Sequence, residues 1–307
     1  QQRFERSEKQ HIATGYASFD KLTIFCYNKN MKLSETKLIV KLSAFDLDDT
    51  LLTDKKIISP RTVSAIQKAA EKGIYIVLCS GRAENGILPF VRQLNIAGSQ
   101  QGRYLIAFNG ASVFDLHLRE QIYSNLVKPE ILKFAYNEAR KRGMASVVYE
   151  SGVIYSWEDS DFARKDAELC NLEFKVVDDF EKFLENGFPK ILISAEPEKV
   201  KEMNEFLCQK IGDKADVFIS KPIFLEVMTK GVGKGPGILW LADKLGIPHE
   251  QTMAFGDSMN DETMIRQCGY SVAMSNGLDY IKDIASFVTR FDNNTDGIAY
   301  FIENFVL

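Results

Sequence analysis

The hydrophobic pattern from Lys37 onward alternates between short continuous apolar runs and stretches of helical periodicity. Leu38–Phe45 and Ile74–Cys79 are apolar runs, as expected for strands that are buried on both faces of a parallel sheet. Between them, Ser59-Pro60 predicts the start of a helix, and Gly73 predicts its end. Repetition of this strand–helix order predicts an α/β protein with a doubly wound, mainly parallel sheet, that is, a Rossmann-like core.

The pattern changes at Lys128-Pro129, where strands and helices no longer follow that regular order. We expect an α+β unit over residues 128–221, inserted into an α/β core made of residues 37–127 and 222–307. Phe224–Met228 is predicted as a strand that returns to the main body. Residues 1–36 precede the pattern as an N-terminal extension with one short predicted strand, Leu22–Tyr27, and we expect Met31 to be the physiological start.

Composition narrows the class of protein. The 307 residues are 45% hydrophobic and 26% charged, enough for one large or two medium domains. The net charge is -4 with no basic stripe, so nucleic acid is not an expected partner. No apolar run is long enough to span a bilayer and no signal peptide is recognised, so we expect a cytoplasmic protein without a membrane partner. The sequence does not indicate an oligomeric state.

Cysteine and histidine usage limits the possible metal chemistry. The five cysteines are scattered, without a Cys-x-x-Cys pair, which argues against a disulfide framework or a zinc site and favours a reducing compartment. The three histidines are far apart in the sequence. Any metal site is therefore expected to use oxygen ligands.

Polar segments follow three of the predicted strands. They are Asp46–Thr50, Ser80–Arg82 and Gly256–Asp261. Ligands of open α/β sheets bind at the carboxyl ends of the strands, so these segments could converge in space. A lone Asp-x-Asp is usually an acidic turn. Two carboxylates beside a buried strand, however, are costly unless a cation relieves them.

Together with Lys234, these segments contain the groups that a phosphoryl site needs. Asp46 and Asp48 suit a hard, oxygen-seeking ion such as Mg²⁺, and Asp257 can complete its shell. Ser80 and the amides that follow it can bind phosphate oxygens. Lys234 can neutralise charge that develops on a transferred phosphoryl group.

Four segments carry a family resemblance. Asp46–Leu52, Ser80-Gly81-Arg82, Lys234-Gly235 and Gly256–Asp261 resemble, in order, the four motifs of the haloacid dehalogenase superfamily of phosphatases. Asn109-Gly110-Ala111 and the C-terminal segment resemble its Cof-type subgroup. That subgroup has an α+β cap domain between the second and third motifs, where the insertion over residues 128–221 is expected. The resemblance covers the chain from about Lys37 onward.

The resemblance implies a reaction and its chemical groups. Asp46 would be the nucleophile that forms an aspartyl-phosphate, and Asp48 the general acid and then the general base. Mg²⁺ would be bound by the side chains of Asp46 and Asp257 and by the backbone carbonyl of Asp48. The implied enzyme is a Mg²⁺-dependent phosphatase of small phosphorylated metabolites, with sugar phosphates and phosphorylated cofactors as leading classes.

The remaining site residues follow from the same resemblance. The phosphoryl oxygens would be held by amides near Leu47 and Gly81, by Ser80 and by Lys234. Asn260 would contact phosphate or orient Lys234. Supporting roles are expected for three further residues. Asp261 would support the metal shell, and Thr50 would fix the loop. Arg82 would either reach the cap or substrate or pair with an acid.

Two other functions remain open at this point. A phosphomutase can share the architecture and the aspartyl-phosphate, but it must bind a second phosphate and so needs cationic cap residues that face the core. A non-catalytic binding or regulatory protein is the other alternative, and the intact acids argue against it. In the insertion, Tyr155, Trp157 and Arg164 either face the substrate or only pack and contact solvent.

Overall fold

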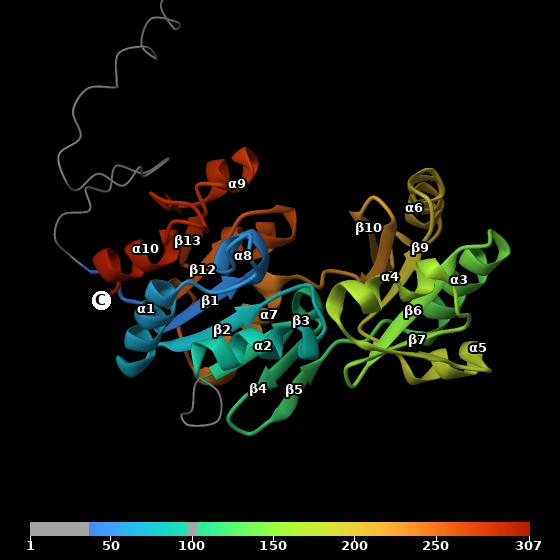
Figure 1. The fold of residues 1–307 in the computed structure, drawn as a ribbon, viewed down its shortest axis with the longest axis horizontal. Helices are drawn as coiled ribbons and strands as arrows, with labels where there is room; N and C mark the ends of the chain where they lie inside the picture. The colour runs from blue at the N-terminus through green and yellow to red at the C-terminus, as the bar shows by residue number, and fades with distance from the viewer. Residues whose placement is uncertain (1–36, 97–102) are drawn as a thin grey trace, which may run out of the picture.

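The computed structural model describes residues 37–96 and 103–307, which form two β sheets (Figure 1). The larger sheet has eight strands in the order β14-β13-β12-β1-β2-β3-β4-β5, and the smaller has six in the order β10-β11-β9-β6-β7-β8. The N-terminal extension, its predicted strand Leu22–Tyr27 and the proposed start at Met31 lie outside the described residues.

The eight-stranded sheet is mainly parallel, as predicted. Its strands from β14 to β3 are parallel, and β4 and β5 form an antiparallel edge. The strands are β1 (Leu42–Asp46), β2 (Tyr75–Cys79), β3 (Arg103–Ala107), β4 (Ser112–Asp115), β5 (Glu120–Ser124), β12 (Thr252–Gly256), β13 (Tyr270–Ala273) and β14 (Phe287–Val288). The helices of this unit are α1 (Pro60–Glu71), α2 (Glu84–Leu94), α7 (Lys234–Leu245), α8 (Glu262–Gln267), α9 (Asp279–Ile284) and α10 (Gly297–Phe305).

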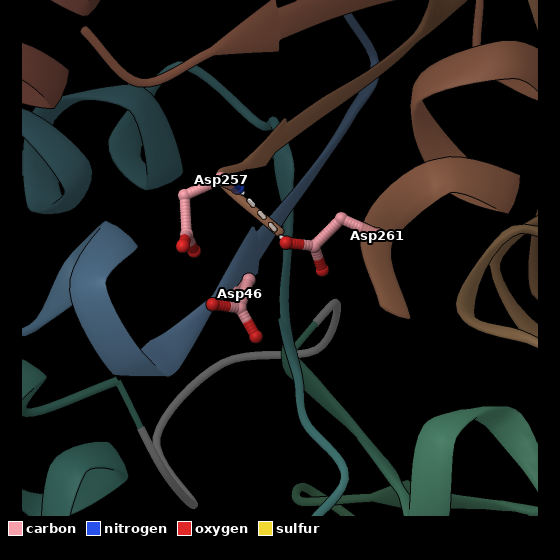
Figure 2. Close-up of side chains that lie close together, drawn as sticks. All are labelled: Asp46, Asp257 and Asp261. Carbon is pink, nitrogen blue, oxygen red and sulfur yellow. Dashed lines mark hydrogen bonds between the residues drawn. The ribbon is translucent and has the colours of Figure 1, made fainter. Parts of the chain in front are cut away.

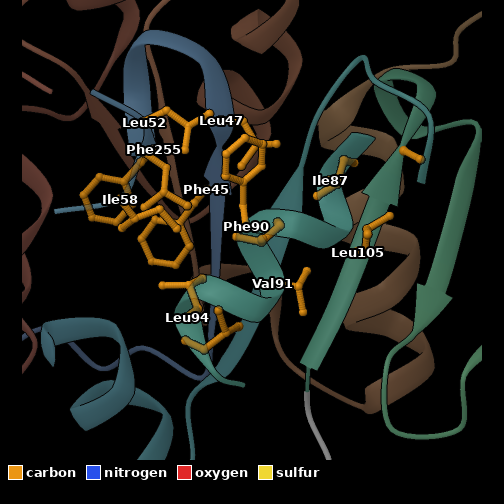
Figure 3. Packing of buried hydrophobic residues seen from close by; sticks show 14 of the residues in the cluster. Phe45, Leu47, Leu52, Ile58, Ile87, Phe90, Val91, Leu94, Leu105 and Phe255 are labelled. Atoms are coloured by element: carbon orange, nitrogen blue, oxygen red, sulfur yellow. The ribbon is translucent and has the colours of Figure 1, made fainter. Parts of the chain in front are cut away.

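Helices cover both faces of this sheet, which makes the fold doubly wound. Residues of α1, α2 and α10 pack against one face, where the rings of Phe45 and Phe255 stack at 5.1 Å (Figure 3). Residues of α7 and α8 pack against the other face, on alternate strand residues such as Ala44 and Ala254. Because the strands are buried on both sides, their sequences are continuously apolar.

The local signals explain where α1 begins. Ser59 Oγ accepts a hydrogen bond of 3.2 Å from the backbone N–H of Thr62, and Pro60 occupies the first helical position. Both features supply the cap that a helix N-terminus needs. Helix α7 begins at Lys234 itself, so the third motif, Lys234-Gly235, forms the first turn of that helix.

The six-stranded sheet is mainly antiparallel. Its strands are β6 (Ala145–Glu150), β7 (Val153–Ser156), β8 (Glu173–Val176), β9 (Lys190–Ser194), β10 (Ala215–Lys221) and β11 (Phe224–Thr229). Its helices are α3 (Pro129–Lys141), α4 (Asp161–Cys170), α5 (Phe180–Phe183) and α6 (Pro197–Ile211). Residues of α3, α5 and α6 pack on one face. Helix α4 lies over the opposite face, on the side of the larger sheet (Figure 1).

The strand Phe224–Met228 does not return to the main body, so that prediction was wrong. The strand β11 pairs antiparallel with β10 and β9 of the six-stranded sheet. Only two residues, Pro222 and Ile223, separate it from β10, and a connection this short forms a hairpin. The chain therefore leaves the second sheet after Thr229, not at residue 222.

No helix in the described part of the chain combines the length and the apolar character that crossing a membrane requires.

Candidate active site

The carboxyl ends of three neighbouring strands bring the predicted polar segments together. Asp46, at the end of β1, is in register with Cys79 at the end of β2, so Ser80 follows directly beside it. On the other side Phe45 is in register with Phe255 of β12, and Asp257 comes two residues later. A parallel sheet places such residues at one edge, which is why segments so distant in sequence meet.

The ammonium group of Lys234 joins two of the acids. Its Nζ lies 2.5 Å from Asp46 Oδ1 and 2.6 Å from Asp261 Oδ1, and the lysine is fully buried. The turn at Gly110 lies against Gly233, the residue that precedes Lys234. Gly110 has φ +103°, and a Cβ there would lie 2.1 Å from the carbonyl oxygen of Gly233. Glycine is therefore required for the turn to approach the start of α7 this closely.

Asp261 is held by the backbone that follows β12. Its Oδ2 accepts hydrogen bonds from the backbone N–H groups of Asp257 (2.9 Å) and Ser258 (3.1 Å). Gly256 permits this fold-back, since a Cβ there would lie 2.6 Å from the Cβ of Asp261. Thr50 Oγ1 donates a hydrogen bond of 2.7 Å to Asp257 Oδ1. Figure 2 shows the three carboxylates converging, with the backbone bond between the two C-terminal acids.

The arrangement fits a divalent cation. Asp46, Asp257 and Asp261 each offer an oxygen, and these atoms lie within 4.8 Å of one another. Burial and the neighbouring carboxylates raise the pKa of Asp46 well above its usual value, and burial and Asp261 raise the pKa of Asp257 to about 6. Three carboxylates face a single ammonium, so the ionised group has surplus negative charge that a cation would balance.

The three acids are not equivalent as ligands. Both oxygens of Asp261 already accept hydrogen bonds, one from Lys234 and one from backbone amides. Within the described ranges, Asp46 and Asp257 each direct only one oxygen at a protein donor. Asp46 and Asp257 are therefore better placed to bind a metal than Asp261, which positions the lysine and the loop.

Asp48 lies in a different environment from the other acids. Its carboxylate accepts two hydrogen bonds from Arg82, Nε to Oδ2 at 2.9 Å and Nη2 to Oδ1 at 2.7 Å, and a third from Lys56 at 3.0 Å. Its side chain is 40% exposed. Burial acts against the charge, but the hydrogen bonds from Arg82 and Lys56 hold the pKa of Asp48 below its usual value.

The two cations that bind Asp48 differ in how far the sequence predicts them. Arg82 takes the pairing role that was one of its two alternatives. Lys56 was missed, and no signal separates it in the sequence from its neighbour Lys55. It is brought to Asp48 by a turn in which Lys56 itself has φ +56°.

The other predicted residues surround this core. Ser80 is buried and its Oγ accepts a bond of 3.2 Å from the N–H of Arg82. Gly81 lies against Asn109, where a Cβ would be 3.0 Å from Oδ1. Asn260 is exposed, and its Nδ2 lies 3.4 Å from Asn109 Oδ1. Among the residues that the structure describes, the partners of the Lys234 ammonium are the carboxylates of Asp46 and Asp261, so Asn260 does not orient it. The Leu47 side chain is buried in the apolar core.

Comparison with known proteins agrees with this geometry. Residues 43–302 match the model of the haloacid dehalogenase-like hydrolase family, so the chain belongs to that family. A haloacid dehalogenase-like hydrolase of Bacteroides thetaiotaomicron has a similar structure, with a TM-score of 0.79 and 31% identity, covering 86% of this chain and 98% of that one.

Two further relatives have named activities. The Bacillus subtilis 5-amino-6-(5-phospho-D-ribitylamino)uracil phosphatase YcsE is 27% identical over 279 residues, covering 90% of this chain and all (100%) of that protein. The subclass IIB sugar phosphatase BT4131 superposes with a TM-score of 0.72 at 26% identity, covering 87% of this chain and 99% of that one. Together with the family match, these relatives identify the chain as a phosphatase of the haloacid dehalogenase-like family.

Proposed function

We propose that the protein is a Mg²⁺-dependent phosphatase of small phosphorylated metabolites that works through an aspartyl-phosphate on Asp46. The observation that carries the proposal is the buried group formed by Asp46, Lys234, Asp261 and Asp257. It combines a carboxylate at a strand end, a fixed ammonium and a place for a cation. These are the parts that in-line phosphoryl transfer requires.

In the first step, a carboxylate oxygen of Asp46 attacks phosphorus. The bond from phosphorus to the alcohol oxygen breaks, and the departing alcohol takes a proton from Asp48. In the second step, Asp48 accepts a proton from water, whose oxygen attacks phosphorus. The bond to the Asp46 oxygen breaks, so inorganic phosphate leaves and the carboxylate is restored.

The phosphoryl oxygens are held by donors around Asp46. We assign this role to Lys234, to the hydroxyl of Ser80 and to the backbone amides of Leu47 and Gly81. Mg²⁺, held by the side chains of Asp46 and Asp257 and by the backbone carbonyl of Asp48, would add positive charge against the same oxygens. Asp261 keeps Lys234 ionised and aimed at this position.

Asp48 needs a change of partner for its first task. While Arg82 and Lys56 bind it, its carboxylate is ionised and ready to act as a base. To protonate an alcohol, it must exchange these bonds when substrate occupies the site. Catalytic hydrogen bonds rearrange and tighten when substrate binds, which permits this exchange.

The second sheet supplies the candidate cap. We propose that residues 128–229, with the boundary moved to include β11, cover the phosphoryl site and exclude water from it. Sugar phosphates and phosphorylated cofactors are the proposed substrates, and the names of the two phosphatase relatives support both classes.

A phosphate-ester panel tests this function. Phenyl phosphate, aldose phosphates, alditol phosphates and phosphorylated cofactors are each incubated with Mg²⁺ or with EDTA, and released phosphate is measured. We expect Mg²⁺-dependent release from phenyl phosphate and from at least one metabolite. Phosphate release that EDTA leaves unchanged would contradict the metal, and no release from any ester would contradict the activity.

A further inference from the structure

The face of the second sheet that carries α4 contains buried polar groups that the proposed chemistry does not use. Tyr149 on β6, Lys190 on β9 and Glu226 on β11 are only 4%, 5% and 6% exposed. Asp166 on α4 joins them. We call these four residues the cap-sheet cluster. Their neighbours on the same face include the apolar residues Leu192 and Met228, which belong to the hydrophobic core shared with the larger sheet.

The cluster is only partly satisfied by its own members. Tyr149 donates a hydrogen bond of 2.6 Å from its hydroxyl to Asp166 Oδ2. Lys190 Nζ lies 3.2 Å from Glu226 Oε2, yet no donor in the described part of the chain is aligned to hydrogen-bond that oxygen. A buried carboxylate oxygen without a hydrogen bond is costly, which indicates that a further donor belongs beside it.

The cluster borders the phosphoryl site. Lys190 Nζ is 6.0 Å from the centre of the Phe108 ring, and the rings of Tyr149 and Phe108 are 5.6 Å apart. Phe108 immediately precedes Asn109, which lies against Gly81. An ester whose phosphate lies at Gly81 therefore extends toward the cluster when its alcohol portion points to the second sheet.

Packing alone does not account for these residues. Buried ion pairs are often less stabilising than apolar side chains of similar volume, because desolvation offsets their attraction. A sheet face that only had to contact the larger sheet would need no Lys190 or Glu226. Groups that both donate and accept hydrogen bonds at such a face suit a neutral ligand with several hydroxyls.

We propose that the cap-sheet cluster binds the polyhydroxylated alcohol portion of the substrate, as in a sugar or alditol phosphate. Glu226 accepts hydrogen bonds from substrate hydroxyls, while Lys190 donates to their oxygens. Asp166 and Glu226 leave the cluster with an excess of negative charge, which disfavours a second phosphate and so the phosphomutase alternative. The proposal rests on the proposed phosphatase function.

The test compares two substrates in one variant. K190M/E226L replaces the ion pair with apolar side chains, and kcat/KM is measured for phenyl phosphate and for the best aldose or alditol phosphate of the panel. We expect the ratio of polyol to phenyl activity to fall about 10- to 100-fold, since bonds from charged groups to hydroxyls are lost. An unchanged ratio in a folded variant would overturn the proposal.

Controls separate recognition from folding. K133M/E185L removes a partly exposed ion pair between Lys133 on α3 and Glu185 in the turn after α5, with atoms 2.9 Å apart, and is expected to leave the ratio unchanged. Tyr149→Phe removes a single hydroxyl and gives a smaller fall in the same ratio, which keeps the test valid if the double variant does not fold. Wild-type hydrolysis of phenyl phosphate but of no polyol phosphate would overturn this inference and leave the phosphatase function standing.

Discussion

A buried lysine lies at each of the two sheets, and the two lysines have different surroundings. Lys234 contacts two carboxylates at 2.5 and 2.6 Å, within a group that still has surplus negative charge. Lys190 contacts one carboxylate at 3.2 Å, and an oxygen of that partner lacks a hydrogen bond. Burial opposes the charge of both, but the neighbouring acids raise the pKa of each above its usual value.

The surroundings of each lysine indicate which chemical groups each site binds. At the sheet edge, the fixed ammonium and the surplus of acids suit a phosphoryl group together with a cation. On the face of the second sheet, the loose pair suits neutral hydroxyls. The same substitution at Lys234 and at Lys190 should therefore have different effects on activity and stability.

The largest effect is expected from Asp46→Asn. Loss of the nucleophile should lower the turnover of phenyl phosphate by about 10⁴-fold or more. Folding should be spared, because a neutral amide replaces a carboxylate whose pKa is raised by burial. Asp49→Asn is the matched control, since Asp49 lies in the turn with φ +61° and its side chain is exposed. Near-normal turnover by the Asp46 variant would refute its role.

Lys234→Met should combine loss of activity with loss of stability. It leaves Asp46 and Asp261 buried without their cation, so the free energy of unfolding should fall by about 3–5 kcal/mol in urea titrations. The control is Lys230→Met, at the lysine four positions before Lys234, which removes an exposed ion pair with Asp216. It should change the free energy of unfolding by about 1 kcal/mol or less. Equal losses in the two variants would break the distinction.

Replacing Lys190 together with its partner Glu226 should cost less stability than replacing Lys190 alone. Lys190→Met alone leaves Glu226 buried and unpaired, which should cost about 3 kcal/mol in the same urea titrations. K190M/E226L should regain most of that loss. By contrast, K234M/D261N should remain destabilised, since Asp46 keeps its buried charge. Full recovery in both double variants would show that the two sites are equivalent.

Mg²⁺ should stabilise the protein in a pH-dependent manner. The raised pKa of Asp257, about 6 against 3.8 ordinarily, favours the folded state when the group is protonated. That contribution is complete below about pH 3.8 and is lost as the pH rises through about 6. Because the cation needs ionised ligands, added Mg²⁺ should raise the Tm more at about pH 7.5 than at about pH 5.

Thermal scans with Mg²⁺ and with EDTA measure this difference, and Asp257→Asn should reduce it. An equal Mg²⁺ shift at both pH values would argue that the acids do not hold the ion.

The sequence predicts the core of the fold and the catalytic edge for a physical reason. Strands buried on both faces are continuously apolar, and the acids of Asp46–Thr50 and Gly256–Asp261 interrupt that pattern where each strand ends. Their meeting follows from the parallel topology. The sequence does not predict which sheet contains β11. An apolar strand of six residues suits either sheet, and only its hairpin with β10 places it in the second one.

The cap-sheet cluster shows what the sequence leaves hidden. Tyr155 and Trp157 are candidates from the sequence for facing the substrate, yet these two residues pack with the helices on the far face of the second sheet. Lys190 and Glu226 are isolated charged residues in apolar strands, 36 positions apart along the chain. Only strand pairing places them side by side. The contact of Lys234 with Asp261 is hidden in the same way.

The most direct test of the mechanism is to trap the phosphoryl group. Asp48→Asn removes the base that assists the water attack, whereas phenolate is a better leaving group than an alkoxide and depends less on a proton from Asp48. Enzyme quenched in acid during turnover of phenyl phosphate should therefore accumulate the intermediate. Mass spectrometry of the digest should find a phosphoryl group, removed by hydroxylamine, on the peptide that contains Asp46. Turnover with that peptide unmodified, in both the wild type and the variant, would contradict an aspartyl-phosphate mechanism on Asp46.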